Sequence, residues 1–314
     1  MRSIIFIVGP TALGKTEVSY HLCQRIGAEV ISCDSMLAYK EPAIITSKPP
    51  VYMLNEVKHH FVGVISVTQS YSVFEYCSKA VDRISGLLKE GKPVVVCGGS
   101  GLYVNALLDG IAKAPGKDAS MRKNLLSKAE EKGVQYLYEK LKDVDSKSAS
   151  RISANDLKRI IRALEVYYST GVAMSDRLET TKSLWKNFPV RIFGLRAKRE
   201  IMYERINKRV DLMFSKGAVD EVKRLCKTDL SLTAEKIIGI KEISRFLSGE
   251  LSLDEAKEQM KKSTRRFAKR QVTWFRRDKR INWIDIDRLT PEQIAKNIYN
   301  IVTVSYTHLT LPTN

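Results

Sequence analysis

The chain has 314 residues, of which 44% are apolar and 28% are charged, a composition typical of a globular protein with one large or two modest domains. It argues against a membrane-spanning protein, since no apolar run approaches the roughly 18 residues that a transmembrane helix needs. The 53 Lys and Arg residues outnumber the 35 Asp and Glu residues, and the net charge of +18 predicts a polyanionic partner, with nucleic acid the leading candidate.

The first predicted elements are a buried strand and a phosphate-binding loop. Ile4–Val8 are apolar and mostly β-branched, and they run directly into Gly9–Thr16, which has the form G-x-x-x-x-G-K-T. Glycines let the backbone approach an anion closely, so the N–H groups of the loop and the start of the following helix can bind a polyphosphate. Lys15 would add a full positive charge, and the Thr16 hydroxyl suits a Mg²⁺ ligand. The predicted loop consists of Gly9, Pro10, Thr11, Ala12, Leu13, Gly14, Lys15 and Thr16.

The position of this loop and the cysteines predict where the protein works. Because the loop begins at residue 9, we expect no signal peptide. The five cysteines are scattered and no C-x-x-C pair occurs, so we expect neither a zinc site nor a disulfide framework. Both features favour a reducing cytoplasm.

A second strand places an acidic residue near the loop. The predicted helix over 15–26 is followed by a strand over Ala28–Cys33, which ends at Asp34. Residues just past the carboxyl end of a parallel strand face the ligand site, so we expect Asp34 beside the phosphate loop. A role as a turn or N-cap residue explains Asp34 equally well at this point. The irregular stretch 40–70 contains His59-His60, for which a structural or lid role is favoured over metal binding because no third ligand has usable spacing.

A third strand leads into a second glycine-rich turn. Ser72–Glu75 is a capping box that begins a helix to about residue 90. Pro93–Cys97 is the strand, and Gly98–Tyr103 is the turn that follows it at the same edge of the predicted sheet. Glycine lets this backbone approach a ligand and Ser100 can hydrogen-bond one, although a plain tight turn is the simpler explanation.

Residues 113–185 lack strand signals and carry amphipathic helical patterns, which predict a helical insertion between strands of the sheet. Helices are expected over 119–132, from Val134, and over Asn155–Thr170. In the last of these, Lys158 and Arg162 lie four residues apart on one face, where they could contact a polyanion or simply be solvated.

The C-terminal part returns to the sheet and holds most of the clustered positive charge. Val190–Leu195 is the fourth predicted strand, and the helix after it carries Arg205 and Arg209, one turn apart, which could bind a pyrophosphate. The helical stretch 252–277 interleaves many Lys and Arg residues with aromatic residues that could pack inward or stack on a base. Ile281–Asp285 is a last short strand, and the uncharged tail, taken as 303–314, is expected to be non-native or disordered.

Together these motifs resemble those of the tRNA dimethylallyltransferases, the bacterial type of tRNA isopentenyltransferase (IPP transferase). The resemblance runs from about Ile4 to Asp285. It rests on the order and spacing of Gly9–Thr16, Asp34-Ser35 with Tyr39, His59-His60, Gly98–Tyr103, Asn155–Glu165, Ile238-Gly239 and Ala268–Arg276. It implies an α/β fold with a P-loop kinase-like parallel sheet flanked by helices and an inserted all-helical domain. The implied catalytic core is 1–112 and 188–302, including the basic C-terminal helical region, and the implied insertion is 113–187.

The resemblance also implies a reaction, in which dimethylallyl diphosphate donates its dimethylallyl group to N6 of adenine 37 in the anticodon stem-loop of a tRNA. By motif, Asp34 is the implied general base, Ser100 its partner, and the phosphate loop with Mg²⁺ on Thr16 the diphosphate site. The implied tRNA contacts are Asp34, Ser35, Met36, Leu37, Ser100, Arg122, Lys158, Arg159, Ile160, Ile161, Arg162, Lys236, Gly239, Lys241, Lys269, Arg270, Gln271, Trp274 and Arg276.

The sequence departs from the family pattern at several positions. Ser100 stands where the family more often has Thr, Lys158 replaces a usual Gln, and Ile240 replaces a frequent Tyr. These differences put single contacts in doubt, namely a specific polar contact at Lys158 and a packing or base contact at Ile240. The zinc finger of the eukaryotic relatives does not occur in this sequence.

Three other activities fit parts of the sequence. They are prenylation of free AMP on the same scaffold, phosphoryl transfer by an ATP-dependent small-molecule kinase, and RNA binding by a P-loop protein that uses nucleotide only as a switch. The helical insertion and the basic stretch 252–277 argue against the first. Asp34 and Ser100 favour a prenyl donor over ATP in the phosphate loop, and we expect a monomer.

Overall fold

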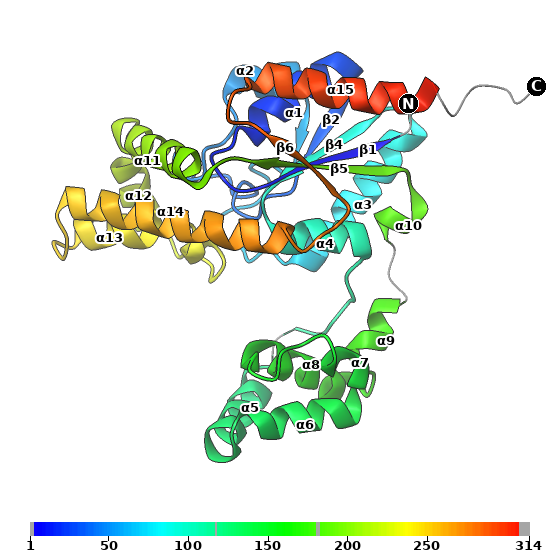
Figure 1. Ribbon diagram of the computed structural model, residues 1–314. Helices are drawn as coiled ribbons and strands as arrows, with labels where there is room; N and C mark the ends of the chain where they lie inside the picture. Colours follow the sequence, from blue (N-terminus) through cyan, green and yellow to red (C-terminus); the bar gives the residue numbers. More distant parts are fainter. Residues whose placement is uncertain (1–2, 117, 180–182, 308–314) are drawn as a thin grey trace, which may run out of the picture. The chain divides into compact units, whose positions relative to one another are not determined.

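The computed structural model describes residues 3–116, 118–179 and 183–307, and the chain divides into two compact units (Figure 1). The first unit consists of the chain up to Leu107 and again from Leu184 onward. The second unit is the intervening segment Leu108–Ser183. Among the described residues, none of the helices combines the length and the apolar character that crossing a bilayer requires.

The first unit is built on a parallel sheet, which has six strands within the described residues, in the order β3-β2-β4-β1-β5-β6. The strands are β1 Ile4–Val8, β2 Glu29–Ser32, β3 His59–His60, β4 Val94–Gly98, β5 Val190–Arg196 and β6 Ile281–Asp285. The central strand β1 pairs Ile5 with Val95 of β4 on one side and with Arg191 of β5 on the other. The predicted α/β fold with a parallel sheet is therefore confirmed, and β3 is a strand that the sequence patterns did not reveal.

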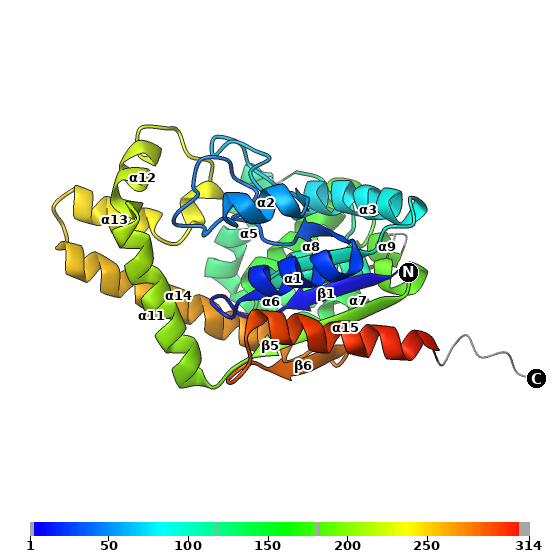
Figure 2. The ribbon, with the colours of Figure 1, turned by 90° about the horizontal axis from the view of Figure 1, so that it is seen from above.

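Helices cover both faces of this sheet. The helices of the first unit are α1 Lys15–Ile26, α2 Val51–Glu56, α3 Val73–Lys89, α4 Gly101–Asp109, α10 Leu184–Asn187, α11 Arg199–Ser215, α12 Ala218–Leu225, α13 Ile240–Leu247, α14 Leu253–Phe275 and α15 Pro291–Thr307. Figures 1 and 2 show α1 and α15 side by side over one face, with α3 on the other. Because side chains alternate along a strand, Ile5 and Ile7 of β1 face Leu22 of α1 and Ile298 of α15 in one core.

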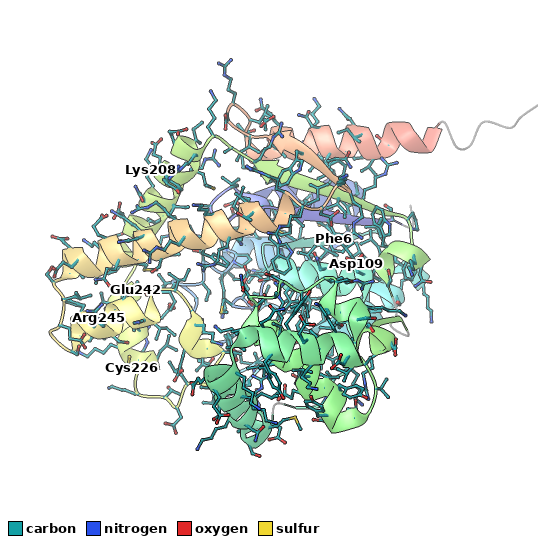
Figure 3. All side chains as sticks on the ribbon, turned by 60° about the horizontal axis from the view of Figure 1, so that its bottom comes forward. Phe6, Asp109, Lys208, Cys226, Glu242 and Arg245 are labelled. Atoms are coloured by element: carbon teal, nitrogen blue, oxygen red, sulfur yellow. The ribbon has the colours of Figure 1, made fainter. Side chains whose placement is uncertain are left out.

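A second hydrophobic core lies under α11, α12 and α13 and holds the segment that the sequence left irregular. Ile45 and Val67 from that segment, and Tyr39 just before it, pack against buried residues of these helices. The buried carboxylate of Glu221 on α12 accepts hydrogen bonds from the amides of Ala43, Ile44 and Ile45, at 2.7, 2.8 and 2.9 Å. One side chain thus satisfies three backbone donors of a loop without regular structure. Figure 3 contrasts such interior positions, for example Phe6 in the sheet, with Lys208 and Arg245 on the helices.

The second unit consists of helices within its described residues. They are α5 Ala119–Lys132, α6 Val134–Val144, α7 Ser146–Ala149, α8 Leu157–Thr170 and α9 Met174–Glu179. Leu125, Leu137, Leu141, Ile160 and Leu164 form its core, at the spacing that an apolar helix stripe requires. The predicted helical insertion is confirmed, and its first helix has the predicted bounds 119–132.

The C-terminal helix α15 was not predicted. Its Ile294, Ile298 and Val302 recur at intervals of four and are buried against α1, which explains why a helix forms here. The expected tail from residue 303 therefore begins inside this helix, whose backbone continues to Thr307. The helix thus includes residues 303–307 of the expected tail, while residues 308–314 lie outside the described residues.

Candidate active site

The phosphate loop lies at the carboxyl end of β1 and adopts a conformation that favours glycine. Gly9 and Gly14 have φ of 136° and 78°, and Ala12 has φ of 66°, so all three occupy the left-handed half of backbone space. At Gly9 there is no room for a side chain, because a Cβ would lie 2.6 Å from the carbonyl oxygen of Leu195. Among the described residues, no side chain caps the start of α1. The positive end of this helix is thus available to an anion.

Two cations adjoin the loop. Lys15 Nζ donates to the Pro10 carbonyl at 2.8 Å. Arg209 of α11 donates through Nη1 to Thr11 Oγ1 at 3.2 Å and through Nε to Ser47 Oγ at 2.9 Å. The pKa of Lys15 is lowered to about 8, chiefly by burial. Cys97 and Asp34 raise this pKa and Arg209 lowers it, and the value of about 8 is the net result. Of the predicted pair, Arg209 contacts the loop, whereas Arg205 has no hydrogen bond or ion pair within the described part of the chain.

Asp34 and Ser100 come from neighbouring strands and lie on adjoining turns. The Asp34 carboxylate accepts a hydrogen bond from the Met36 amide at 2.9 Å, which fixes the turn after β2. Ser100 Oγ accepts from the Ser35 amide at 3.1 Å, so the turn after β4 is joined to the turn after β2. Asp34 and Ser100 are both only half-buried. The carboxylate is also near enough to Lys15 to raise the pKa of that amine, which places Asp34 beside the phosphate loop as predicted.

The glycine-rich turn after β4 contains glycine because its neighbours approach so closely. A Cβ on Gly98 would lie 2.0 Å from the carbonyl oxygen of Cys33, and a Cβ on Gly99 would lie 2.3 Å from Nε2 of Gln271. A Cβ on Gly101 would meet the Trp274 ring at 2.4 Å. The structure therefore requires close packing at all three glycines, two of them against α14.

Helix α14 contributes buried as well as exposed residues to this region. Gln271 is 5% exposed; its Oε1 accepts from the Thr11 amide at 2.8 Å and its Nε2 donates to the Gly99 carbonyl at 2.9 Å. Trp274 is half-buried and donates from Nε1 to Asn105 Oδ1 at 3.3 Å. The side chain of Gln271 is thus engaged within the protein, in contrast to its predicted role as a tRNA contact. Three other predicted contacts on this helix or just after it are exposed, namely Lys269, Arg270 and Arg276.

The remaining predicted tRNA contacts of the first unit differ in accessibility. Lys236 and Lys241 are exposed on either side of Gly239, which is buried and has φ of 108°. Gly239 shapes the turn there, since its side-chain position is filled by Met260 and Ile45. Ser35, Met36 and Leu37 are half-buried beside Asp34.

In the second unit, the predicted contact segment 158–162 alternates between surface and core. Lys158 and Arg159 are exposed, whereas Ile160 and Ile161 are 0% and 5% exposed and belong to the hydrophobic core. The side chains of Ile160 and Ile161 thus face the core of the unit, because a helix necessarily turns part of a five-residue segment inward, whereas Lys158 and Arg159 are accessible to a partner.

Arg122 and Arg162, also predicted as tRNA contacts, converge on a residue that sequence reasoning missed. Glu165 is fully buried; it accepts from Arg122 Nη2 at 2.8 Å, from Arg162 Nη1 at 2.6 Å and from the Asp118 amide at 2.7 Å. Arg162 also donates to the Pro115 carbonyl at 2.8 Å. In the sequence, the sign of this buried ion pair is an acidic residue within the apolar stripe of α8, three residues after Arg162.

Replacing Glu165 by alanine is expected to destabilise the second unit by about 3 kcal/mol, because the variant leaves two guanidinium groups without their shared carboxylate. Hydrogen exchange of α5 and α8 amides measures this as a lower free energy of local opening. As a control, Glu139→Ala removes an exposed carboxylate that pairs with Lys142 on α6 and should leave that exchange unchanged. Equal effects of the two substitutions would contradict the assigned role of Glu165.

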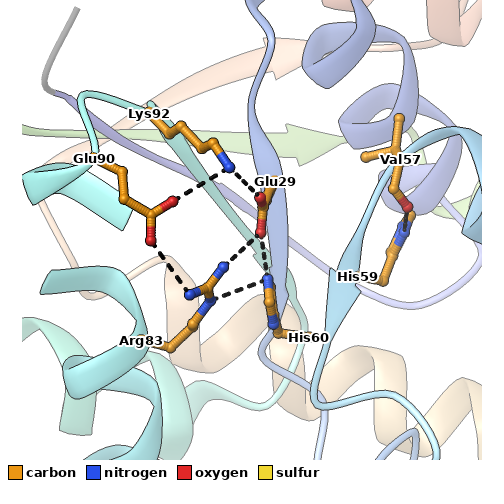
Figure 4. A network of polar contacts seen from close by, with 7 residues as sticks. All are labelled: Glu29, Val57, His59, His60, Arg83, Glu90 and Lys92. Atoms are coloured by element: carbon orange, nitrogen blue, oxygen red, sulfur yellow. Dashed lines mark hydrogen bonds and ion pairs between the residues drawn. The ribbon is translucent and has the colours of Figure 1, made fainter. Parts of the chain in front are cut away.

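The histidine pair lies in a structural network at the edge of the sheet (Figure 4). His60 Nε2 and Glu29 Oε2 are 2.6 Å apart, and Arg83 and Lys92 each donate to the same carboxylate at 3.1 Å. Burial raises the pKa of Glu29, but the bonds from His60, Lys92 and Arg83 outweigh it and lower the pKa to about 2. His60 thus joins β3 to β2, in line with the structural role favoured from the sequence.

Comparison with known proteins decides the family. The model of the IPP transferase family matches residues 37–278. The tRNA dimethylallyltransferase of Acetivibrio thermocellus is 40% identical over 302 residues, which cover 95% of this chain and 96% of that protein. This chain belongs to the IPP transferase family. As a member of the family it is a prenyltransferase.

Solved structures of IPP transferases have the same fold. The full-length tRNA isopentenylpyrophosphate transferase of Bacillus halodurans is 34% identical, with a TM-score of 0.70 over 97% of this chain and 96% of that chain. A eukaryotic dimethylallyltransferase acting on tRNA is 26% identical, with a TM-score of 0.80 over 99% of this chain and 81% of its own. The phosphate loop precedes the residues that the family model matches, so its assignment rests on the geometry described above.

Proposed function

We propose that this IPP transferase moves the dimethylallyl group of dimethylallyl diphosphate to N6 of adenine 37 in tRNA and releases pyrophosphate. The observation that carries the proposal is the meeting of a phosphate loop with the Asp34 carboxylate and the Ser100 hydroxyl at neighbouring strand ends. The loop accounts for the diphosphate of the donor, and the carboxylate accounts for the proton that the attacking amine must lose. The names of the relatives in Acetivibrio thermocellus and Bacillus halodurans support the same substrates.

The acceptor in this reaction is a weak nucleophile, because the lone pair of an exocyclic adenine amine is delocalised into the ring. As N6 bonds to the allylic carbon, the carboxylate of Asp34 takes one proton from the amine. Ser100 orients the amine through its hydroxyl, which Ser35 already holds in place. The base must leave its stack to reach these groups, which costs a few kcal/mol, roughly, and is cheapest in a single-stranded loop.

The donor loses pyrophosphate as the C–O bond breaks, and negative charge develops on the departing oxygens. Lys15, Arg209 and the free amides at the start of α1 stabilise that charge. Because pyrophosphate departs whole, no phosphoryl group is transferred. The same loop that would hold ATP in a kinase therefore holds the leaving group here.

The loop is also suited to Mg²⁺. Among the described residues, no group of three or more His, Cys, Asp or Glu side chains is arranged to hold a metal, so a complete protein-built site is not formed there. Mg²⁺ commonly binds through one or two protein oxygens together with phosphate oxygens and water, and the half-exposed Thr16 hydroxyl fits that pattern. Bound with the donor, the ion would neutralise charge on the diphosphate.

The proposed tRNA contacts are exposed cations of each unit, namely Lys236, Lys241, Lys269, Arg270 and Arg276 in the first unit and Lys158 and Arg159 in the second. Each cation that neutralises a phosphate releases a counterion, so the affinity for tRNA should fall steeply with salt, by about 10³-fold or more between 50 and 200 mM for six or more contacts. Filter binding at increasing KCl measures the slope. Arg270→Ala should make the slope shallower by about one. A flat salt dependence would contradict the assignment of these residues to tRNA.

The two rival enzymes make opposite predictions for the same experiment. Protein and Mg²⁺ are incubated either with dimethylallyl diphosphate and tRNA, or with that donor and AMP, or with γ-labelled ATP and tRNA. We expect label from the donor in tRNA only. Label in AMP but not in tRNA would favour the AMP prenyltransferase, and transfer of γ-phosphate would favour a kinase.

A further inference from the structure

We propose that Gln271 is a positioning residue, which fixes the phosphate loop relative to the turn that carries Ser100. The proposal rests on the function proposed above and adds a residue to it. Gln271 was expected to contact tRNA, but its amide is buried and bonded at both ends within the protein. It is separated from one bonding partner, Thr11, by 260 positions in the sequence, so this contact is a product of the fold.

The planar amide of Gln271 bridges two loops that hold opposite halves of the proposed reaction. Its oxygen accepts the Thr11 N–H of the phosphate loop at 2.8 Å, and its nitrogen donates to the Gly99 carbonyl at 2.9 Å. Gly99 directly precedes Ser100, whose hydroxyl accepts from Ser35 beside Asp34. The bridge therefore links the diphosphate-binding loop to the residues at the attacking amine. Strands β1 and β4 are already paired up to Val8 and Gly98, and beyond that pair the amide of Gln271 links the two turns directly.

The surroundings of Gln271 are built to keep the bridge. Position 99 admits no side chain, because a Cβ would lie 2.3 Å from Gln271 Nε2 and 3.1 Å from the carbonyl oxygen of Gly9. One turn further along α14, Trp274 lies against Gly101 in the same way. The bridge also occupies the Thr11 N–H, which is therefore not free to bind an anion.

The bridge starts from the helix that presents the proposed tRNA contacts. Lys269 and Arg270, directly before Gln271, are exposed, whereas Gln271 points into the protein. Exposed and buried neighbours should therefore have different kinetic effects. Loss of a cation weakens tRNA binding. Loss of the bridge leaves tRNA binding intact but misplaces the reacting groups, and a shift of about 1 Å can cost 10²-fold in rate.

The test compares Gln271→Met, which keeps the length and removes both hydrogen bonds, with wild-type protein. We expect kcat for tRNA modification to fall by about 30- to 100-fold, with KM for tRNA within about twofold. Arg270→Ala should show the reverse pattern, a raised KM for tRNA with kcat retained. Inorganic pyrophosphate, measured by titration calorimetry at pH 7.5, should bind the Gln271→Met protein about tenfold more weakly, because the loop amides lose their fixed orientation.

Two further variants separate positioning from folding. Gln259→Met makes the same substitution on α14, at a half-buried glutamine that bonds Arg245 and lies away from both loops, and should leave kcat and pyrophosphate binding unchanged. Gln271→Asn keeps the amide but is one methylene too short for both partners, and it should resemble Gln271→Met. If either folded Gln271 variant keeps kcat and pyrophosphate affinity within twofold of wild type, the proposal is overturned. Pyrophosphate binding tests the bridge even if wild-type protein does not modify tRNA, which would refute the proposed function separately.

Discussion

Replacing Asp34 by asparagine is expected to lower the rate of dimethylallyl transfer by about 10²- to 10⁴-fold, the usual contribution of a general base. Asparagine is the sharpest substitution, because its oxygen can still accept the hydrogen bond that Met36 donates at 2.9 Å. The turn after β2 should therefore keep its shape while the proton acceptor is lost. Single-turnover transfer of labelled dimethylallyl groups to tRNA measures the effect, and filter binding should show tRNA affinity within about twofold of wild type.

Asp229→Asn is the matched control for this prediction. Asp229 is exposed, and the substitution changes the net charge by the same amount. Its transfer rate should equal that of wild type. If the Asp34→Asn protein modified tRNA at the wild-type rate, Asp34 would be a turn residue only, and another group would have to accept the proton of the amine.

Replacing Lys15 by methionine is expected to reduce kcat by about 10²- to 10³-fold, because the departing diphosphate loses a positive charge that is positioned at the phosphate loop. In the free protein, Lys15 donates to the Pro10 carbonyl at 2.8 Å, and this bond holds the amine at the loop. The Lys15→Met variant should bind tRNA normally. Lys89→Met, at an exposed position on α3, is the control with the same change of charge and should be fully active.

The pH dependence of donor binding tests the role of the Lys15 charge in the wild-type protein. The pKa of Lys15 is lowered to about 8, chiefly by burial, so its positive charge is present below pH 8 and is lost as the pH rises through 8. A thiolo analogue of dimethylallyl diphosphate has a diphosphate that is fully ionised above about pH 7.5. Its affinity should fall about tenfold per pH unit above pH 8. Lys15→Met should abolish this decline, and an unchanged decline in the variant would show that another group titrates.

The parts of the site that follow from local sequence were predictable. Apolar strands ending in Gly9–Thr16, Asp34 and Gly98–Tyr103 carry their own signals, and parallel pairing brings their carboxyl ends to one edge of a sheet. The same holds for the helices of the second unit, whose apolar spacing is regular. In these cases neighbours in the sequence determine the structure.

The parts that depend on distant partners were not predictable. Gln271 reads as one more polar residue in a basic helix, and only the fold brings Thr11 and Gly99 to its amide. The two-residue strand β3 forms only because β2 pairs with it. The role of Glu165 likewise depends on two arginines, Arg122 and Arg162, which the fold brings to its carboxylate. The motif around Ile160 and Ile161 marks a family but does not tell which face of α8 lies inward.

The central claim is that the phosphate loop holds a prenyl diphosphate whose allyl group passes to tRNA. Mass analysis of nucleosides from tRNA, after incubation with this protein, dimethylallyl diphosphate and Mg²⁺, tests it most directly. We expect N6-dimethylallyl adenosine among these nucleosides, formed together with an equal amount of pyrophosphate. Unmodified tRNA, with no pyrophosphate released from the donor, would contradict the account.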